Sequence, residues 1–221
     1  MLHAQSNFTL DEVSQKVVCK RVFLINATRP IDSLYILAQR WMSNSTKFFQ
    51  KNADPPIDVH NEKKMKQKHD IDVLFENPRP LQILDPERRG IVGMGMLQYY
   101  GNSMNSIKLL YLRYDIYITV KVDSIIMTVS NIHYYHFTPK NYTQIWLYNF
   151  SGGKPCEEKG IIETLMKCED FHSEFKSLAS YFNKEIFGLF IDFNNLLLKK
   201  KLLYESNVVS STPIVNSHKK E

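Results

Sequence analysis

The clearest pattern in the chain is an alternation of apolar and polar residues over residues 107–122. Every second position from Leu110 to Val122 is apolar or aromatic, and this period of two is typical of a strand with one buried face and one wet face. Further runs rich in apolar residues are separated from it and from one another by turn sequences. They cover residues 81–84, 91–100 and 125–137. The pattern therefore predicts an antiparallel meander.

Two elements precede the meander. Residues 16–26 are largely apolar on both alternating faces, which indicates a central strand. Residues 30–50 predict a helix, because Pro30 suits the first helical position and Asp32 adds negative charge to the first turn. The apolar positions of this helix recur at helical spacing and form a core stripe of Leu34, Leu37, Ala38, Trp41 and Phe48.

Residues 51–80 differ in composition from the segments on either side. They contain several prolines and a lysine run from Lys63 to Lys68. This composition favours an excursion loop that contains a short helix near residues 61–69. Acidic residues interrupt the lysines, so we interpret the run as a solvated surface rather than a phosphate-binding site.

Residues 138–204 combine an aromatic loop with C-terminal helices. A short helix carries Ile161, Ile162 and Leu165, and a longer one carries an apolar stripe from Phe171 to Leu196. We expect this stripe to pack on the sheet, and it is also the best candidate surface for a homodimer. The remaining segments predict an N-terminal arm over 1–15 and a flexible tail over 205–221.

Together these elements predict an α+β protein. An antiparallel sheet of about five strands carries the 30–50 helix within a domain of residues 16–137, and a C-terminal helical extension follows.

The helix and the meander resemble a known family over roughly residues 16–135. The residues that carry the resemblance are Asp32-Ser33-Leu34-Tyr35 with Ala38 and Trp41, Asp85 with Gly90-Ile91-Val92-Gly93-Met94-Gly95, and the hairpin of 114–121 and 125–132. They are similar to a domain of unknown function described as having a TBP-like fold, found in exported proteins of Gram-negative gut bacteria. The resemblance implies a curved antiparallel sheet with a helix on one face, and it implies export to the periplasm or the exterior. It implies no known activity, because a shared fold does not establish DNA binding.

Composition and charge limit the classes of partner. The 28 Lys and Arg residues against 23 Asp and Glu give a net charge of +5, which is mild, and we expect no nucleic acid partner. No apolar run approaches the ~20 residues of a membrane-spanning helix, so no span is expected. Residues 2–5 resemble the end of a secretory signal peptide, although an ordinary short N-terminus fits them too. Cys156 and Cys168 are spaced so that they can pair, and we interpret Cys19 as a small buried hydrophobe.

Candidate chemistry along the chain is sparse. The glycines from Gly90 to Gly95 precede a strand rather than a helix, so they indicate a turn and close backbone packing. His133 and His136 lie three apart on a strand and point to opposite faces, which argues against a shared metal ion. No nucleophile motif is present. We therefore expect no catalytic, metal-binding or cofactor-binding residues, and no enzymatic activity.

The aromatic residues of the meander are the strongest functional signal. Tyrosines on the solvent-exposed face of a sheet offer flat contact area with a polar tip, which suits a partner protein or a sugar. The candidate interaction surface consists of Tyr99, Tyr111, Arg113, Tyr117 and Tyr135. The leading hypothesis is an exported, non-enzymatic binding or structural module that engages a protein or an envelope component. The alternatives are a carrier of an apolar small molecule held between sheet and helices, and a hydrolase assembled from distant residues.

Overall fold

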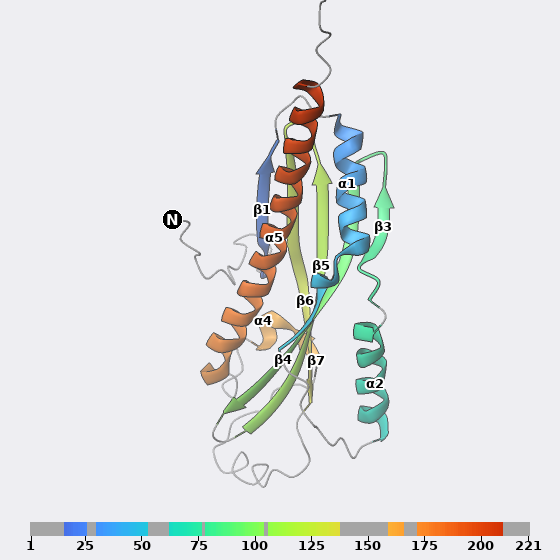
Figure 1. The fold of residues 1–221 in the computed structure, drawn as a ribbon. Helices are drawn as coiled ribbons and strands as arrows, with labels where there is room; N and C mark the ends of the chain where they lie inside the picture. The colour runs from blue at the N-terminus through green and yellow to red at the C-terminus, as the bar shows by residue number, and fades with distance from the viewer. Residues whose placement is uncertain are drawn as a thin grey trace, which may run out of the picture.

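A computed structural model of the chain describes residues 16–25, 30–52, 62–76, 78–103, 106–137, 159–165 and 172–209. Within them a strongly curved sheet forms the centre of the molecule (Figure 1). Its strands are β1 (Cys19–Leu24), β2 (Phe49–Lys51), β3 (Leu81–Asp85), β4 (Gly90–Ser103), β5 (Ser106–Val120), β6 (Ser124–Phe137) and β7 (Lys159–Ile161).

The long strands β4, β5 and β6 form the predicted antiparallel meander. The strand order is β1-β6-β5-β4-β2, with β3 added to β4 and β7 added to β6. β5 is the central strand, since it pairs along its length with β4 on one side and with β6 on the other. The prediction of an α+β fold built on a curved sheet of about five strands is confirmed, apart from the two short added strands.

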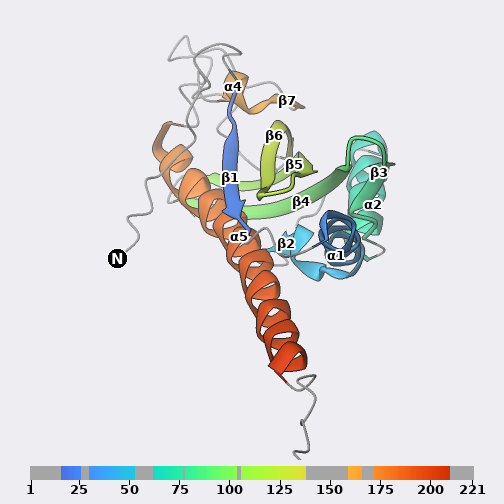
Figure 2. The same ribbon diagram turned by 90° about the horizontal axis from the view of Figure 1, so that it is seen from above.

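The helices are α1 (Ile31–Asn44), α2 (Glu62–Glu76), α4 (Ile162–Leu165) and α5 (His172–Val209), with a 3₁₀ turn η1 (Thr46–Phe48) after α1. α1 and α5 lie on the same face of the sheet (Figure 2). The ring of Tyr114 on β5 packs 5.8 Å from the ring of Phe182 on α5, and the methionine Met42 of α1 lies over Gly93 of β4. This face holds the main core.

The alternation of apolar and polar residues in the sequence of β5 corresponds to the side chains that are buried in the core. Every second side chain of β5 faces α1 and α5 and is buried, and these are Leu110, Leu112, Tyr114, Ile116, Ile118 and Val120. The helix α5 buries the predicted stripe of Leu178, Phe182, Ile186, Leu189 and Phe193 against them. Full burial of one such side chain contributes roughly 1.5–3 kcal/mol, so the two stripes together hold the helix on the sheet.

The first helix is shorter than the sequence predicts. It ends at Asn44, because Ser45 takes an extended conformation and its N–H donates to the Trp41 carbonyl as a cap. Phe48, which the pattern placed on the helix, is fully buried from η1 instead. The chain then forms β2, which runs parallel to β4, so the prediction of a purely antiparallel sheet was wrong at this edge. The connection from β2 to β4 runs through α2 and β3 rather than through a hairpin turn, and such a long crossover permits parallel pairing.

The first strand is an edge strand, not the central one that its sequence indicates. β1 pairs only with β6 among the described residues. Its apolar residues are therefore not all covered: Val22 is 47% exposed and Leu24 is 86% exposed, whereas Phe23 is buried under α5. A strand of mixed apolar pattern can thus lie at an edge when a helix covers one of its faces.

The predicted excursion of residues 51–80 contains more regular structure than a loop. It contributes the end of β2 and the 15-residue helix α2, which is longer than the short helix expected near 61–69. α2 lies against the opposite face of the sheet from α1 and α5, because Phe75 of α2 contacts Tyr111 and Phe49.

The C-terminal helix α5 continues to Val209, past residue 204 where the sequence placed the beginning of a tail. Several expectations lie outside the described residues: the arm over 1–15, the aromatic loop over 138–155, the pairing of Cys156 with Cys168, and the tail beyond 209. None of the described helices combines the length and apolar character that crossing a membrane requires.

Candidate functional site

The sheet has one face that α1 and α5 leave uncovered. The pairing register of β1, β6, β5 and β7 places a set of side chains next to one another on this face. We call it the open face, and it consists of Lys20, Val22, Arg113, Asp115, Tyr117, Thr119, Ile126, Thr128, His133, Tyr135, Lys159 and Ile161. All of these side chains are half-buried or exposed, whereas the described side chains on the opposite side of β5 and β6 are buried.

A polar cluster stands at the centre of the open face. Asn131 donates to the carboxylate of Asp115 and to the hydroxyl of Tyr117, each at 3.1 Å. Tyr117 in turn donates to Asp115 at 3.3 Å, and Lys16 donates to the Asn131 side-chain oxygen at 3.4 Å. Burial, together with the charge of Asp115, raises the pKa of Tyr117, so its hydroxyl remains a donor at neutral pH. The cluster fixes the orientation of Tyr117.

A β-bulge positions Asn131 for this role. The register between β5 and β6 shifts between Arg113 and Asp115, and Asn131 has a φ of 52°. Asparagine is one of the few residues besides glycine that adopt this left-handed conformation readily. The bulge adds one residue to β6 and brings the Asn131 amide over the neighbouring strand.

The charge of the open face is predominantly positive. Lys20, Arg113 and Lys159 are exposed, and none of them has an ion-pair partner within the described residues. Asp115 is the carboxylate among the open-face residues, and the polar cluster already engages it. The face can therefore accept further negative charge from outside the molecule.

Tyr111 does not belong to the exposed surface that the sequence predicts. It is fully buried, and its ring lies 5.9 Å from that of Phe75 on α2. Its hydroxyl donates to Asp72 of the same helix at 3.1 Å. The expectation that Tyr111 is solvent-exposed was wrong, because α2 covers this end of the sheet face. The sequence had indicated that the residues of α2 belong to an excursion loop.

Tyr99 lies on the other side of the sheet from the open face. It is paired with Leu110 of β5, whose side chain faces the helices, and its ring lies 5.7 Å from that of Tyr181 on α5. The five candidate residues thus do not form one surface. The structure brings Arg113, Tyr117 and Tyr135 together on the open face and separates Tyr99 and Tyr111 from them.

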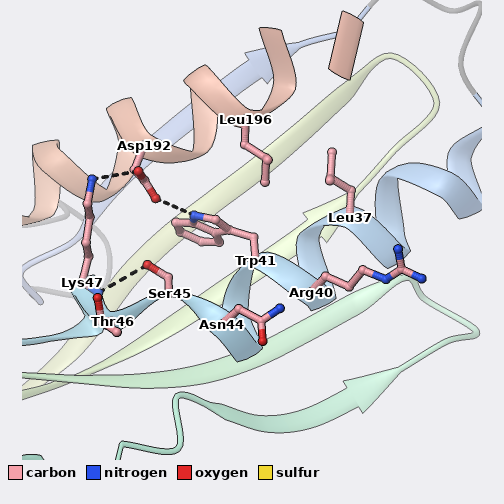
Figure 3. A pocket seen from close by; sticks show the side chains of 9 residues that line it. All are labelled: Leu37, Arg40, Trp41, Asn44, Ser45, Thr46, Lys47, Asp192 and Leu196. Atoms are coloured by element: carbon pink, nitrogen blue, oxygen red, sulfur yellow. Dashed lines mark hydrogen bonds and ion pairs between the residues drawn. The ribbon is translucent and has the colours of Figure 1, made fainter. Parts of the chain in front are cut away.

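A second feature is a surface groove where the end of α1 meets α5. Its volume is about 420 Å³, and the lining residues are Leu37, Arg40, Trp41, Asn44, Ser45, Thr46, Lys47, Asp192 and Leu196 (Figure 3). The groove lies on the helix side of the molecule, away from the open face. It combines an apolar floor with two cations and one carboxylate, but no histidine lines it, so it lacks the base that Ser45 would need as a nucleophile.

The carboxylate of Asp192 on α5 forms hydrogen bonds with residues on the opposite wall of the groove. One carboxylate oxygen accepts a hydrogen bond of 2.9 Å from Trp41 Nε1, and the other accepts one of 2.7 Å from Lys47 Nζ (Figure 3). Burial acts to raise the pKa of Asp192, but the hydrogen bonds from Lys47 and Trp41 outweigh it and hold the pKa below its ordinary value. This arrangement serves to attach α5 to α1.

The lowered pKa of Asp192 predicts a pH-dependent contribution to stability. Because the folded state favours the ionised carboxylate, its stabilisation is present above the unfolded-state pKa of about 3.9 and is lost as the pH falls through the folded-state pKa. We expect Asp192→Asn to lower the free energy of unfolding by about 0.5–1.5 kcal/mol at about pH 6. The difference from the wild type should shrink at about pH 3, as measured by urea unfolding. An unchanged difference at both pH values would contradict this role.

The described part of the chain contains few of the side-chain arrangements that catalysis or metal binding requires. Within those ranges, no group of three or more His, Cys, Asp or Glu side chains lies close enough together to hold a metal ion. Cys19 is half-buried, and burial raises the pKa of its thiol to about 11, so the nucleophilic thiolate is scarcely populated near neutral pH.

The sequence carries a signal for the polar cluster that the alternation over β5 alone does not reveal. The buried apolar positions of β6 are odd-numbered up to Val129 and even-numbered from Ile132 onward. This change of phase marks the bulge, and it singles out Asn131 as the added residue.

Comparison with known proteins finds similarity at the level of solved structures. No protein-family model matches the chain, and no curated protein is similar to it in sequence. A crystal structure of a DUF4468 family protein from Bacteroides ovatus is similar with a TM-score of 0.41 and 15% identity, over 82% of this chain and 90% of that one. A crystal structure of a TBP-like protein from Parabacteroides distasonis is similar with a TM-score of 0.46 and 12% identity, over 83% of this chain and 93% of that one. Both are of the kind that the sequence resemblance named, and at these identities the likeness concerns the fold alone.

Proposed function

We propose that this protein is a non-enzymatic binding module, exported to the periplasm or the exterior, whose open face engages a partner protein with an acidic surface. The observation that supports the proposal is the uncovered sheet face, which carries cations without ion-pair partners among the described residues. The export part rests on the family resemblance in the sequence.

The composition of the open face favours a protein over a nucleic acid. Tyr117 and Tyr135 supply flat contact area with polar tips, and Ile126 and Ile161 add apolar patches beside them. The carboxylate of Asp115 near the centre would repel a phosphate backbone, which is recognised mainly through dense arrays of Lys and Arg. An acidic protein surface can place its carboxylates opposite Arg113 and avoid Asp115.

The alternative of a carrier for an apolar molecule between sheet and helices gains no support. Large side chains occupy that space in the described residues, and Tyr114, Phe182 and Phe193 are fully buried there in contact with neighbouring aromatic rings. The groove beside Trp41 lies at the surface rather than between the sheet and the helices (Figure 3).

A quantitative pull-down tests the proposal. The full chain is immobilised and exposed to an envelope and culture-medium fraction of the native organism, and retained proteins are quantified by mass spectrometry. We expect Arg113→Glu to lower the retention of an acidic protein by at least about tenfold, because it replaces an attractive charge by a repulsive one at the centre of the contact. The retention should also fall with added salt.

The matched control is Arg88→Glu, which makes the same charge change at a residue 89% exposed in the turn between β3 and β4. It should retain the same proteins as the wild type. If no protein distinguishes the wild type from Arg113→Glu while both fold, the open face is not the binding surface.

A further inference from the structure

The groove between α1 and α5 has an apolar middle. Leu37 of α1 and Leu196 of α5 point toward each other across it, and the indole of Trp41 lies beside them (Figure 3). Both leucines are only half-buried, so a molecule in the groove would cover apolar surface that the fold leaves accessible. The volume of about 420 Å³ equals roughly fourteen groups the size of a water molecule, at ~30 Å³ each. The groove therefore has room for a small ligand with an apolar body.

One end of this groove is closed by an ion pair. Lys47 Nζ lies 2.7 Å from Asp192 Oδ1, and the pair joins η1 to α5 beside Trp41 (Figure 3). A peptide that continued in both directions along the groove would meet this ion pair, whereas a molecule whose chain ends inside the groove would not. The closed end thus favours a small molecule over a peptide segment.

The polar groups of the groove favour an anionic ligand. Asp192 is the carboxylate among the lining residues, and its two oxygens already accept hydrogen bonds from Trp41 and Lys47. A cationic ligand would find this carboxylate engaged. Arg40, by contrast, is exposed and has no ion-pair partner within the described residues. Its guanidinium and the nearby amide of Asn44 offer donors that suit a carboxylate.

A second cation lies farther along α5. Lys199 is exposed and follows Leu196 by one helical turn. Although burial acts to raise the pKa of Asp192, the charge of Lys199 helps to lower it, which places Lys199 near the groove. Because the charges of Lys47 and Asp192 offset each other, Arg40 and Lys199 give this region a positive potential that attracts an anion.

The apolar body that fits the groove is aliphatic rather than aromatic. Only 6% of Trp41 is exposed, because Phe48 and Phe193 pack against its ring with centroids 4.9 Å and 4.8 Å away. Little of the indole face is left for an aromatic ligand to stack on. An alkyl chain needs no such face, since contact with the leucine side chains is sufficient to bury it.

We propose that this groove binds a straight-chain monocarboxylate of about eight to ten carbon atoms, a length that its volume accommodates. The alkyl chain lies between Leu37 and Leu196, and the carboxylate pairs with Arg40. The groove is on the helix side of the molecule, away from the open face, so this binding does not depend on the function proposed above.

Isothermal titration calorimetry of the full chain with hexanoate, octanoate and decanoate, below their micelle-forming concentrations, tests the proposal. We expect saturable binding that tightens about two- to fourfold with each added methylene, because each one buries further apolar surface. Arg40→Glu should weaken octanoate binding at least about tenfold. The matched control Arg88→Glu makes the same charge change in the turn between β3 and β4 and should bind as the wild type does. Absence of saturable binding, or an Arg40→Glu variant that binds normally, would overturn the proposal.

Uncharged and cationic analogues test the choice of an anion. 1-Octanol and octylamine should each bind at least about tenfold more weakly than octanoate, since neither can form the ion pair with Arg40. Octylamine that binds as tightly as octanoate would contradict the anionic assignment.

Fluorescence quenching tests the location. The chain has two tryptophans, so Trp41 is the one that remains in a Trp146→Phe variant. We expect 8-bromooctanoate, whose bromine quenches an indole that it contacts, to quench Trp41 saturably, and unlabelled octanoate to reverse the quenching. Calorimetric binding without any quenching of Trp41 would place the ligand outside the groove and overturn the assignment.

Discussion

Phe193→Ala is expected to destabilise the protein by about 3–5 kcal/mol, which is the usual cost of truncating a fully buried aromatic side chain. Phe193 is fully buried, and its ring lies 5.3 Å from that of Phe23 on β1 and 4.8 Å from that of Trp41 on α1. Its removal opens a cavity where α5, β1 and α1 meet. Since a domain is typically stable by only 5–15 kcal/mol, the loss is a large fraction of the whole.

Urea unfolding at one fixed protein concentration measures this effect. Phe193→Leu should cost less than Phe193→Ala, because leucine refills part of the cavity. Ile36→Ala, on the exposed side of α1, serves as the control and should change stability by less than about 1 kcal/mol. If Phe193→Ala cost no more than this control, α5 could not be packed where the structure places it.

Gly95→Ala is the second substitution for which we expect a large loss of stability, about 1–3 kcal/mol from overpacking. A Cβ atom on Gly95 would overlap the ring of Tyr114, which is fully buried between the sheet and α5. The ring cannot move outward, because its edge contacts Phe182 and its hydroxyl donates to the Phe48 carbonyl at 3.3 Å. The packing of the core must therefore be disturbed.

The same glycine-to-alanine change on α5 provides the matched control. A Cβ on Gly188 meets no atom within 4 Å, and alanine favours a helix by about 0.5–1 kcal/mol over glycine, so Gly188→Ala should stabilise the protein. Thermal unfolding of both variants gives the comparison. In a double-mutant cycle, Tyr114→Leu should remove most of the additional cost of Gly95→Ala; strict additivity would rule out the clash as the cause.

The sequence predicted those elements whose pattern of apolar residues reflects burial of one face only. The alternation from Leu110 to Val120 and the stripe from Leu178 to Phe193 both report burial against one neighbouring layer, and both were confirmed. The buried residues of β5 and those of α5 pack against each other, so each apolar pattern reflects burial against the other element.

The placement of the surrounding elements depends on contacts that a local pattern does not encode. β1 has apolar residues on both faces but lies at an edge, because α5 covers only one of them. α2 has a weak apolar pattern, and its contact with Tyr111 arises from only a few residues, including Phe75 and Asp72. The sequence therefore could not show that α2 buries Tyr111. The helix α2 does not cover Arg113, Tyr117 and Tyr135, so these three residues remain on the open face.

We propose the open face as the surface through which this protein binds its partner. Site-specific photo-cross-linking in the native organism tests it most directly, with p-benzoylphenylalanine placed at Tyr135 or Thr119 on the open face and at Ile36 on α1 as the control. We expect the same acidic protein to be cross-linked from positions 135 and 119 and not from position 36. Cross-linking from position 36 with none from positions 135 and 119 would show that the partner binds elsewhere than on the open face.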